Sequence, residues 1–77
     1  MKKEWDAELD ATGLLCPLPV LKARSRMRQL KPGQVLRILA DDPAAIIDFP
    51  HFCADQGHEL KDSRTTRMPF VFHIAKG

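Results

Sequence analysis

The chain has 77 residues, enough for one domain and too few for two, so we expect residues 1–77 to form a single domain. Its hydrophobic content of 44% and charged content of 29% are ordinary for a folded soluble protein, and a net charge of +2 favours no particular partner. No apolar run approaches the roughly 20 residues of a membrane span. No apolar stretch follows Met1-Lys2-Lys3 as in a signal peptide, so we expect a cytoplasmic protein with free thiols.

The first predicted element is a half-buried strand over residues 5–11. Apolar and acidic side chains alternate there without exception, which is the period of a strand with one buried face. Trp5 begins the apolar series, and we expect its ring to cover the core from an edge strand. Thr12-Gly13 ends the strand.

The next element is a helix that begins at the cysteine. Proline is tolerated in the first helical turn, so Pro17 and Pro19 mark a helix start with Cys16 at or near the N-cap. Spacings of three and four residues then define one apolar helical face, made of Val20, Ala23, Met27 and Leu30. Residues 31–33, Lys-Pro-Gly, stop the helix.

The second half of the chain predicts a central strand, a helix and two further strands. The strand spans residues 34–40, and the helix runs from Pro43 towards Gln56 with an aspartate cap, a stop at Gly57 and a kink or break at Pro50. Residues 58–64 resemble an edge strand, and residues 70–75 form a strong last strand after a turn. This order predicts a two-layer α+β sandwich with both helices on one sheet face.

Cys16 is the candidate reactive residue. The thiolate is the reactive form of cysteine, and a helix N-terminus offers unpaired N–H groups and a partial positive charge that stabilise it. Leu18 and Val20 keep their N–H groups between and after the prolines. We therefore expect the pKa of Cys16 to lie below the ordinary value. The alternative is a small, buried and inert cysteine at a helix end.

Several other cysteine chemistries lack their usual partners. Position 19 is proline, so the Cys-x-x-Cys pair of disulfide oxidoreductases is absent, and nothing marks a histidine as the base of a protease-like site. Cys53 with His51 and His58 is a weak zinc pattern, so we expect no metal, no cofactor and a packing role for Cys53. A lone activated thiol fits a carrier that holds a persulfide.

The charges are unevenly distributed along the chain. Residues 20–31 contain five basic residues and no acid, whereas residues 41–62 contain six acids and one lysine. Such asymmetry can steer a charged partner, although a solvated helix face balanced by acids elsewhere explains it equally well.

The sequence resembles the TusA/SirA family of small sulfur-carrier proteins from Leu9 almost to its end. The matching stretches are Leu9-Asp10-Ala11, Gly13-Leu14, Cys16-Pro17-Leu18-Pro19-Val20, Arg24, Lys31-Pro32-Gly33, Ala40-Asp41-Asp42-Pro43-Ala44, Asp48-Phe49-Pro50, Phe52-Cys53, His58-Glu59-Leu60, Pro69-Phe70 and Ile74 to Gly77. The resemblance implies a βαβαββ sandwich with a mixed four-stranded sheet. It also implies that Cys16 accepts persulfide sulfur from a cysteine desulfurase and passes it to a downstream relay protein.

The same resemblance implies roles for other residues and a pathway. Gly13, Pro17 and Pro19 would support the motif, and Arg24 would face the desulfurase. The relay would serve 2-thiouridine formation in tRNA, touching tRNA only indirectly and no membrane. Family members nearest that pathway often carry Arg and Glu where this chain has Leu15 and Leu18. A carrier for another sulfur or selenium pathway, or a non-enzymatic RNA-binding or regulatory module, therefore remains an alternative.

Overall fold

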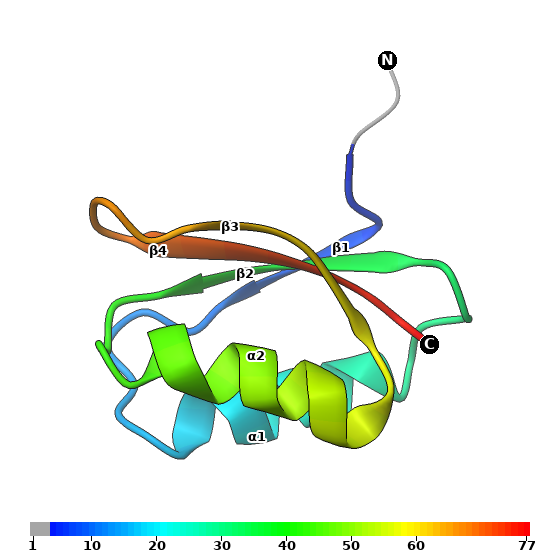
Figure 1. Cartoon of the computed structure of the whole chain (residues 1–77), viewed down its shortest axis with the longest axis horizontal. Helices are drawn as coiled ribbons and strands as arrows, with labels where there is room; N and C mark the ends of the chain where they lie inside the picture. The colour runs from blue at the N-terminus through cyan, green and yellow to red at the C-terminus, as the bar shows by residue number, and fades with distance from the viewer. Residues whose placement is uncertain (1–3) are drawn as a thin grey trace.

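The computed structural model describes residues 4–77. The expectation that Met1-Lys2-Lys3 do not begin a signal peptide therefore falls partly on residues outside the described part. Six elements follow one another along the chain (Figure 1): β1 (Ala7–Asp10), α1 (Leu18–Met27), β2 (Val35–Ala40), α2 (Ala45–Gln56), β3 (Glu59–Arg64) and β4 (Phe70–Ala75). The order matches the predicted βαβαββ arrangement, and each predicted element is present with its ends shifted by a few residues.

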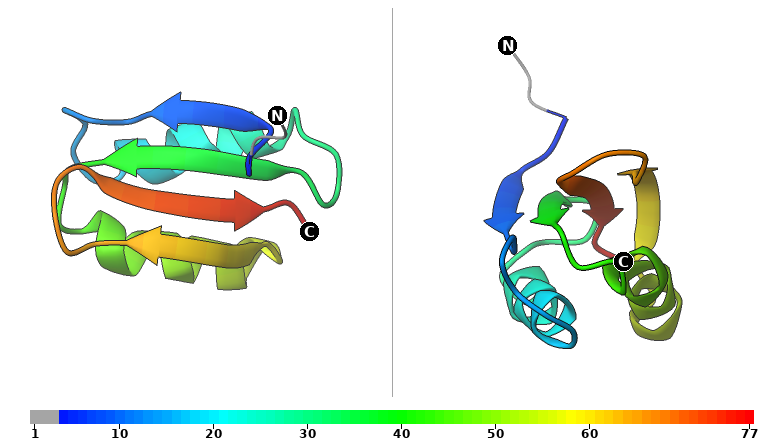
Figure 2. Two further views of the ribbon diagram at one scale, coloured as in Figure 1. Left: turned by 90° about the horizontal axis from the view of Figure 1, so that it is seen from above. Right: turned by 90° about the vertical axis from the view of Figure 1, so that its left-hand side faces the viewer.

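The sheet has the strand order β1-β2-β4-β3. β1 pairs with β2 in parallel, while β4 runs antiparallel to both β2 and β3, so the sheet is mixed. Figure 2 shows both helices on the same face of this sheet. The predicted two-layer α+β sandwich is therefore confirmed, with β3 at an edge as expected.

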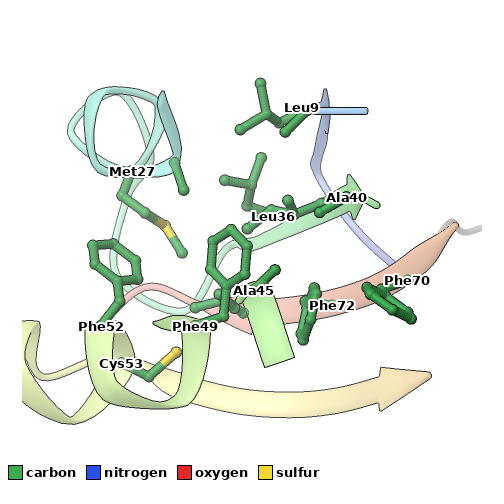
Figure 3. Close-up of a cluster of buried hydrophobic side chains, with 14 residues drawn as sticks. Leu9, Met27, Leu36, Ala40, Ala45, Phe49, Phe52, Cys53, Phe70 and Phe72 are labelled. Carbon is green, nitrogen blue, oxygen red and sulfur yellow. The ribbon is translucent and has the colours of Figure 1, made fainter. Parts of the chain in front are cut away.

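The core lies between the sheet and the two helices (Figure 3). Alternate residues of β2 and β4 point into it, including Leu36, Ile38 and Phe72, all essentially inaccessible to solvent. Phe49 from α2 contributes a fully buried ring, which packs against Phe72 with ring centroids 4.8 Å apart. The predicted apolar face of α1 is confirmed, because Ala23 and Met27 are buried in the same cluster.

Pro50 does not break α2, which is continuous on both sides of it. The expected break is wrong because Phe49, Phe52 and Cys53 are buried against the sheet, and this packing outweighs the one helical hydrogen bond that proline cannot donate. The helix ends where predicted, at Gly57, whose φ of 74° is a left-handed cap conformation that favours glycine.

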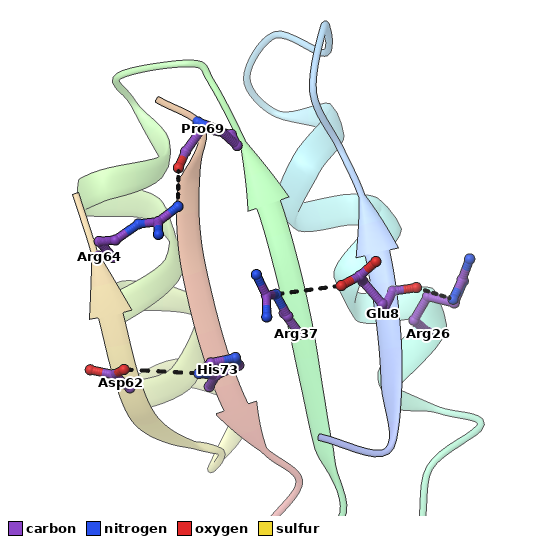
Figure 4. A network of polar contacts seen from close by, with 7 residues as sticks. All are labelled: Glu8, Arg26, Arg37, Asp62, Arg64, Pro69 and His73. Atoms are coloured by element: carbon purple, nitrogen blue, oxygen red, sulfur yellow. Dashed lines mark hydrogen bonds and ion pairs between the residues drawn. The ribbon is translucent and has the colours of Figure 1, made fainter. Parts of the chain in front are cut away.

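The opposite face of the sheet carries polar residues and Trp5. The Trp5 ring stacks on His73 with centroids 5.5 Å apart, and the Arg37 guanidinium lies 4.3 Å from the Trp5 ring. The expectation that Trp5 covers the core is therefore wrong, because β1 begins only at Ala7 and its alternation does not extend back to residue 5. Figure 4 shows Arg37 paired with Glu8 on this face.

Among the described helices, none is both long and apolar enough to cross a bilayer.

Candidate functional site

Cys16 lies in the loop between β1 and α1, and its side chain is exposed to solvent. Pro17 is the N-cap residue of α1, so the cysteine lies one position before the cap, close to the predicted place. Pro19 is buried in the first turn and anchors the start of the helix to the core. The Cys16–Pro17 peptide bond is cis. The expectation of an accessible thiol at the head of a helix is thus matched by the geometry, and the buried alternative is not.

Gly13 fixes the loop that leads to the thiol. Its φ of 80° lies in the left-handed region, which glycine adopts without the steric cost other residues incur. Its backbone N–H donates to both carboxylate oxygens of Asp41, over 3.0 and 3.1 Å. These hydrogen bonds join the loop after β1 to the loop after β2, because the fold brings Asp41 close to Gly13 although the two are 28 residues apart in the sequence.

Asp42 holds the cysteine itself. The backbone N–H of Cys16 donates to Oδ2 of Asp42 over 2.6 Å, and the N–H of Ala44 donates to Oδ1 of the same carboxylate over 3.1 Å. The predicted side-chain cap by this aspartate is wrong: the N-cap of α2 is Ala44, with no side-chain cap hydrogen bond, and the Asp42 carboxylate instead joins the segments that precede the two helices. The position of Cys16 is thus set by hydrogen bonds from a segment 26 residues away.

A groove between α1 and α2 opens beside Cys16, with a volume of about 260 Å³. Its apolar lining includes Leu21 and Phe52, and its polar lining includes Arg24 and Asp48. Arg24 therefore shares a surface with the thiol, although the two residues lie two helical turns apart. Pro17 and Arg24 line this groove, Pro19 is buried in the first turn of α1, and Gly13 lies in the loop that precedes the thiol.

The expected lowering of the Cys16 pKa is wrong in direction. A hydrogen bond to the Asp48 carboxylate raises the pKa of the thiol, and desolvation and the negative charges of Asp48 and Asp42 raise it further. The N–H of Leu18, expected to favour the thiolate, instead donates to the carbonyl of Leu15 over 2.9 Å. Nearby carboxylates thus outweigh the partial charge of the α1 N-terminus.

Cys53 has the opposite environment. Its side chain is only 4% exposed within the core, and burial raises the pKa of its thiol to about 11. The expected packing role is therefore confirmed. In the part of the chain that the structure describes, no three His, Cys, Asp or Glu side chains gather where they could hold a metal ion.

Asp41, Asp42 and Asp48 are the site residues that the sequence did not reveal as such. Their segment was recognisable as an acidic helix start, but its proximity to Cys16 depends on the packing of α2 beside α1. The only available signal was the acidic run after the central strand, since loops following adjacent parallel strands lie at the same edge of a sheet.

We expect Asp48→Asn to make Cys16 more reactive. Removing the carboxylate removes the largest cause of the raised pKa, so the thiol pKa falls and the thiolate fraction at pH 7 increases. Thiolate nucleophilicity declines as pKa falls, so the net gain in alkylation rate is about threefold for each unit of pKa lost. The measurement is the rate of alkylation by iodoacetamide between pH 6 and 10 in a Cys53→Ala background.

Asp55→Asn is the matched control for this experiment. Asp55 lines the same groove but is not among the groups that raise the Cys16 pKa. The midpoint of its alkylation profile should stay at the parental pH. An unchanged or higher midpoint for Asp48→Asn would contradict the assignment of that carboxylate to the thiol.

The fold and the accessible thiol define a small α+β domain with one exposed cysteine beside a groove. A family model described as Sulfurtransferase TusA matches residues 7–76, and the chain belongs to this family of sulfur carriers. The fold is similar to the crystal structure of a SirA-like protein from Desulfitobacterium hafniense, with a TM-score of 0.75. That likeness covers 91% of this chain and 95% of the other at 20% sequence identity, a level that supports the shared fold alone.

Proposed function

We propose that the chain carries sulfur as a persulfide on Cys16. The observation that supports this is the contrast between the two cysteines: Cys16 is exposed beside a groove, whereas Cys53 is buried in the core. A carrier must present its sulfur to one protein and then to another, so only an accessible thiol can serve. The membership in a sulfurtransferase family gives the class of reaction.

The proposed transfer balances without an external oxidant or reductant. The Cys16 thiolate attacks the outer sulfur of a donor persulfide, R–S–SH, and a bond forms between Cys16 Sγ and that sulfur. The S–S bond of the donor breaks, and the donor leaves as a thiolate that takes up the proton lost by Cys16. The carrier now holds Cys16–S–SH, and the same exchange with an acceptor thiol regenerates the free cysteine.

The donor in this proposal is a cysteine desulfurase and the acceptor is a sulfur-relay protein that supports tRNA 2-thiouridine formation. The resemblance of the Cys-Pro-x-Pro segment to the family supports this choice, and the surface suits a protein partner. Leu15 and Leu18 lie within two residues of Cys16 in the chain, and Ile47 precedes Asp48; their exposed fractions are 71%, 45% and 75%. Apolar side chains of this size are suited to burial against another protein surface.

The raised pKa of Cys16 gives the free carrier a resting state. A protonated thiol reacts slowly with stray oxidants and disulfides, because the thiolate is the attacking species. A donor that places a cation beside Asp48 offsets the charge that holds the proton on the thiol. The Cys16 thiolate then forms in the complex, next to the persulfide of the donor.

Mass spectrometry tests the proposal directly. After incubation with a cysteine desulfurase and free cysteine, the protein should gain the mass of one sulfur atom, and peptide mapping without reductant should place it on Cys16. Treatment with dithiothreitol should remove the added mass, as expected for a persulfide. Sulfur recovered only on the Cys53 peptide, or no gain in mass with a desulfurase active on another acceptor, would contradict the proposal.

A further inference from the structure

A second pocket lies between α1, the end of α2 and the chain after β4, with a volume of about 210 Å³. Its lining is cationic and contains no acidic residue: Arg24, Met27, Arg28, Gln56, His58 and Lys76. Its volume compares with about 30 Å³ for one water molecule in the liquid, so a tetrahedral or planar oxyanion fits within it.

The backbone around this pocket is held by hydrogen bonds on both sides of Lys76. The N–H of Lys76 donates to the carbonyl of Gln34 over 2.8 Å, and the carbonyl of Lys76 accepts from the N–H of Gly33 over 2.8 Å. Arg24 lies on α1 and Arg28 is the C-cap residue of that helix, one turn further on, so the two side chains share one side of the helix. The cations thus come from separate elements that converge on one pocket.

His58 supplies a neutral donor to the same pocket. Its Nδ1 accepts a hydrogen bond from the N–H of Gly77 over 3.1 Å, so the ring proton lies on Nε2. Desolvation and the charge of Lys76 lower the pKa of His58, which keeps the ring neutral near pH 7. The other titratable groups that line the pocket with His58 are the permanent cations Arg24 and Arg28. Asp55 does not line the pocket, but its carboxylate accepts a hydrogen bond from the side chain of Gln56, which does.

Within residues 4–77, Arg24, Arg28 and Lys76 take part in no ion pair. The ion pairs of the described chain join Arg37 to Glu8, Lys61 to Glu59 and His73 to Asp62, all on the sheet. An anion that enters the pocket therefore reduces the mutual repulsion among these three cations.

The basic pocket is continuous with the groove beside Cys16, because Arg24 and Gln56 line both. Asp48 and Asp55 line the groove but not the basic pocket, whose charged side chains are all cationic. A nucleic acid lying along the whole groove would bring its phosphates against these two carboxylates, so the charge distribution favours a single anionic group in the basic pocket.

We propose that the basic pocket formed by Arg24, Arg28, His58 and Lys76 binds one oxyanion group. Two sources share this chemistry: a free inorganic anion, and an acidic side chain of the protein that exchanges sulfur with Cys16. The second source rests on the proposed function; the binding itself does not. Charge-assisted hydrogen bonds from the guanidinium and ammonium groups hold the anion, and the Nε2–H of His58 adds a further donor.

Titration with inorganic phosphate, followed by NMR of the histidine rings, tests the site. Potassium chloride is adjusted to hold the ionic strength constant, so that general screening does not change. Phosphate should raise the pKa of His58 in a saturable manner and leave His51, which does not line the pocket, unchanged. Arg28→Gln should weaken binding about tenfold, as expected for the loss of one charge-assisted contact.

Lys22→Gln is the matched control, since Lys22 is an exposed cation of the same helix outside this pocket. It should bind phosphate as the parent protein does. Equal weakening in Lys22→Gln and Arg28→Gln, or no saturable change at His58, would overturn the proposal, because the effect would then reflect net charge alone.

A sulfur-transfer assay distinguishes the two sources. If phosphate competes with a cysteine desulfurase for the parent protein but not for Arg28→Gln, the pocket takes a carboxylate of the partner. If phosphate binds without changing the transfer rate, the pocket takes a free anion. The NMR result stands apart from this assay, so a failure of the proposed sulfur transfer would not be mistaken for a failure of anion binding.

Discussion

Cys16→Ala is expected to abolish sulfur acceptance from a cysteine desulfurase while leaving the fold intact. The thiol is exposed, so its removal creates no cavity, and the free energy of unfolding should change by less than about 0.5 kcal/mol. The contacts that hold the loop come from the backbone N–H of Cys16 and survive the substitution. The added sulfur mass should fall to background in intact-protein mass spectrometry, with unchanged circular dichroism.

Cys53→Ala provides the matched control from the same sequence. With a pKa of about 11, only about one part in ten thousand of the Cys53 thiol is ionised at pH 7, and its side chain is 4% exposed. This variant should keep full sulfur acceptance and lose about 1–2 kcal/mol of stability through the small cavity left in the core. Sulfur retained on the Cys16→Ala protein would show that another residue carries it.

Phe49→Ala is expected to have the largest effect on stability. The Phe49 ring is fully buried and contacts Phe72 and Phe52, with centroids 4.8 and 6.4 Å away, so it joins α2 to the sheet. Replacing a buried phenylalanine with alanine costs about 3–5 kcal/mol. A domain of this size has a stability near the lower end of about 5–15 kcal/mol, so most of it is lost.

Urea denaturation monitored by circular dichroism measures this loss. Ile47→Ala is the control on the same helix, because Ile47 is 75% exposed, and it should change stability by less than about 0.5 kcal/mol. A Phe49→Ala protein as stable as Ile47→Ala would contradict the position of Phe49 at the centre of the core.

Local sequence rules account for the elements of this fold. The Pro17–Pro19 pair, the Gly57 stop and the apolar spacing on α1 depend only on backbone sterics and helical periodicity, which neighbours in sequence determine. The alternation over residues 5–11 predicted a strand, but it did not predict that the strand starts only at Ala7. That start depends on a contact distant in the sequence, because the Trp5 ring stacks on His73 of β4.

The electrostatic state of Cys16 could not be predicted in this way. The partial charge of a helix N-terminus is a local property, whereas Asp42 and Asp48 reach the thiol only when α2 packs beside α1. A carboxylate near the sulfur outweighs a helix terminus because it carries a full charge and accepts the thiol proton in a hydrogen bond.

The sequence by itself determined the order of strands and helices, the place of the thiol before α1 and the burial of Cys53. The tertiary structure alone decided which charges face that thiol, that Pro50 stays within a continuous helix, and that Arg24, Arg28, His58 and Lys76 converge on one pocket. The physical reason is range: periodicity and backbone sterics act between neighbours in the chain, whereas Coulomb interactions and packing act between neighbours in space.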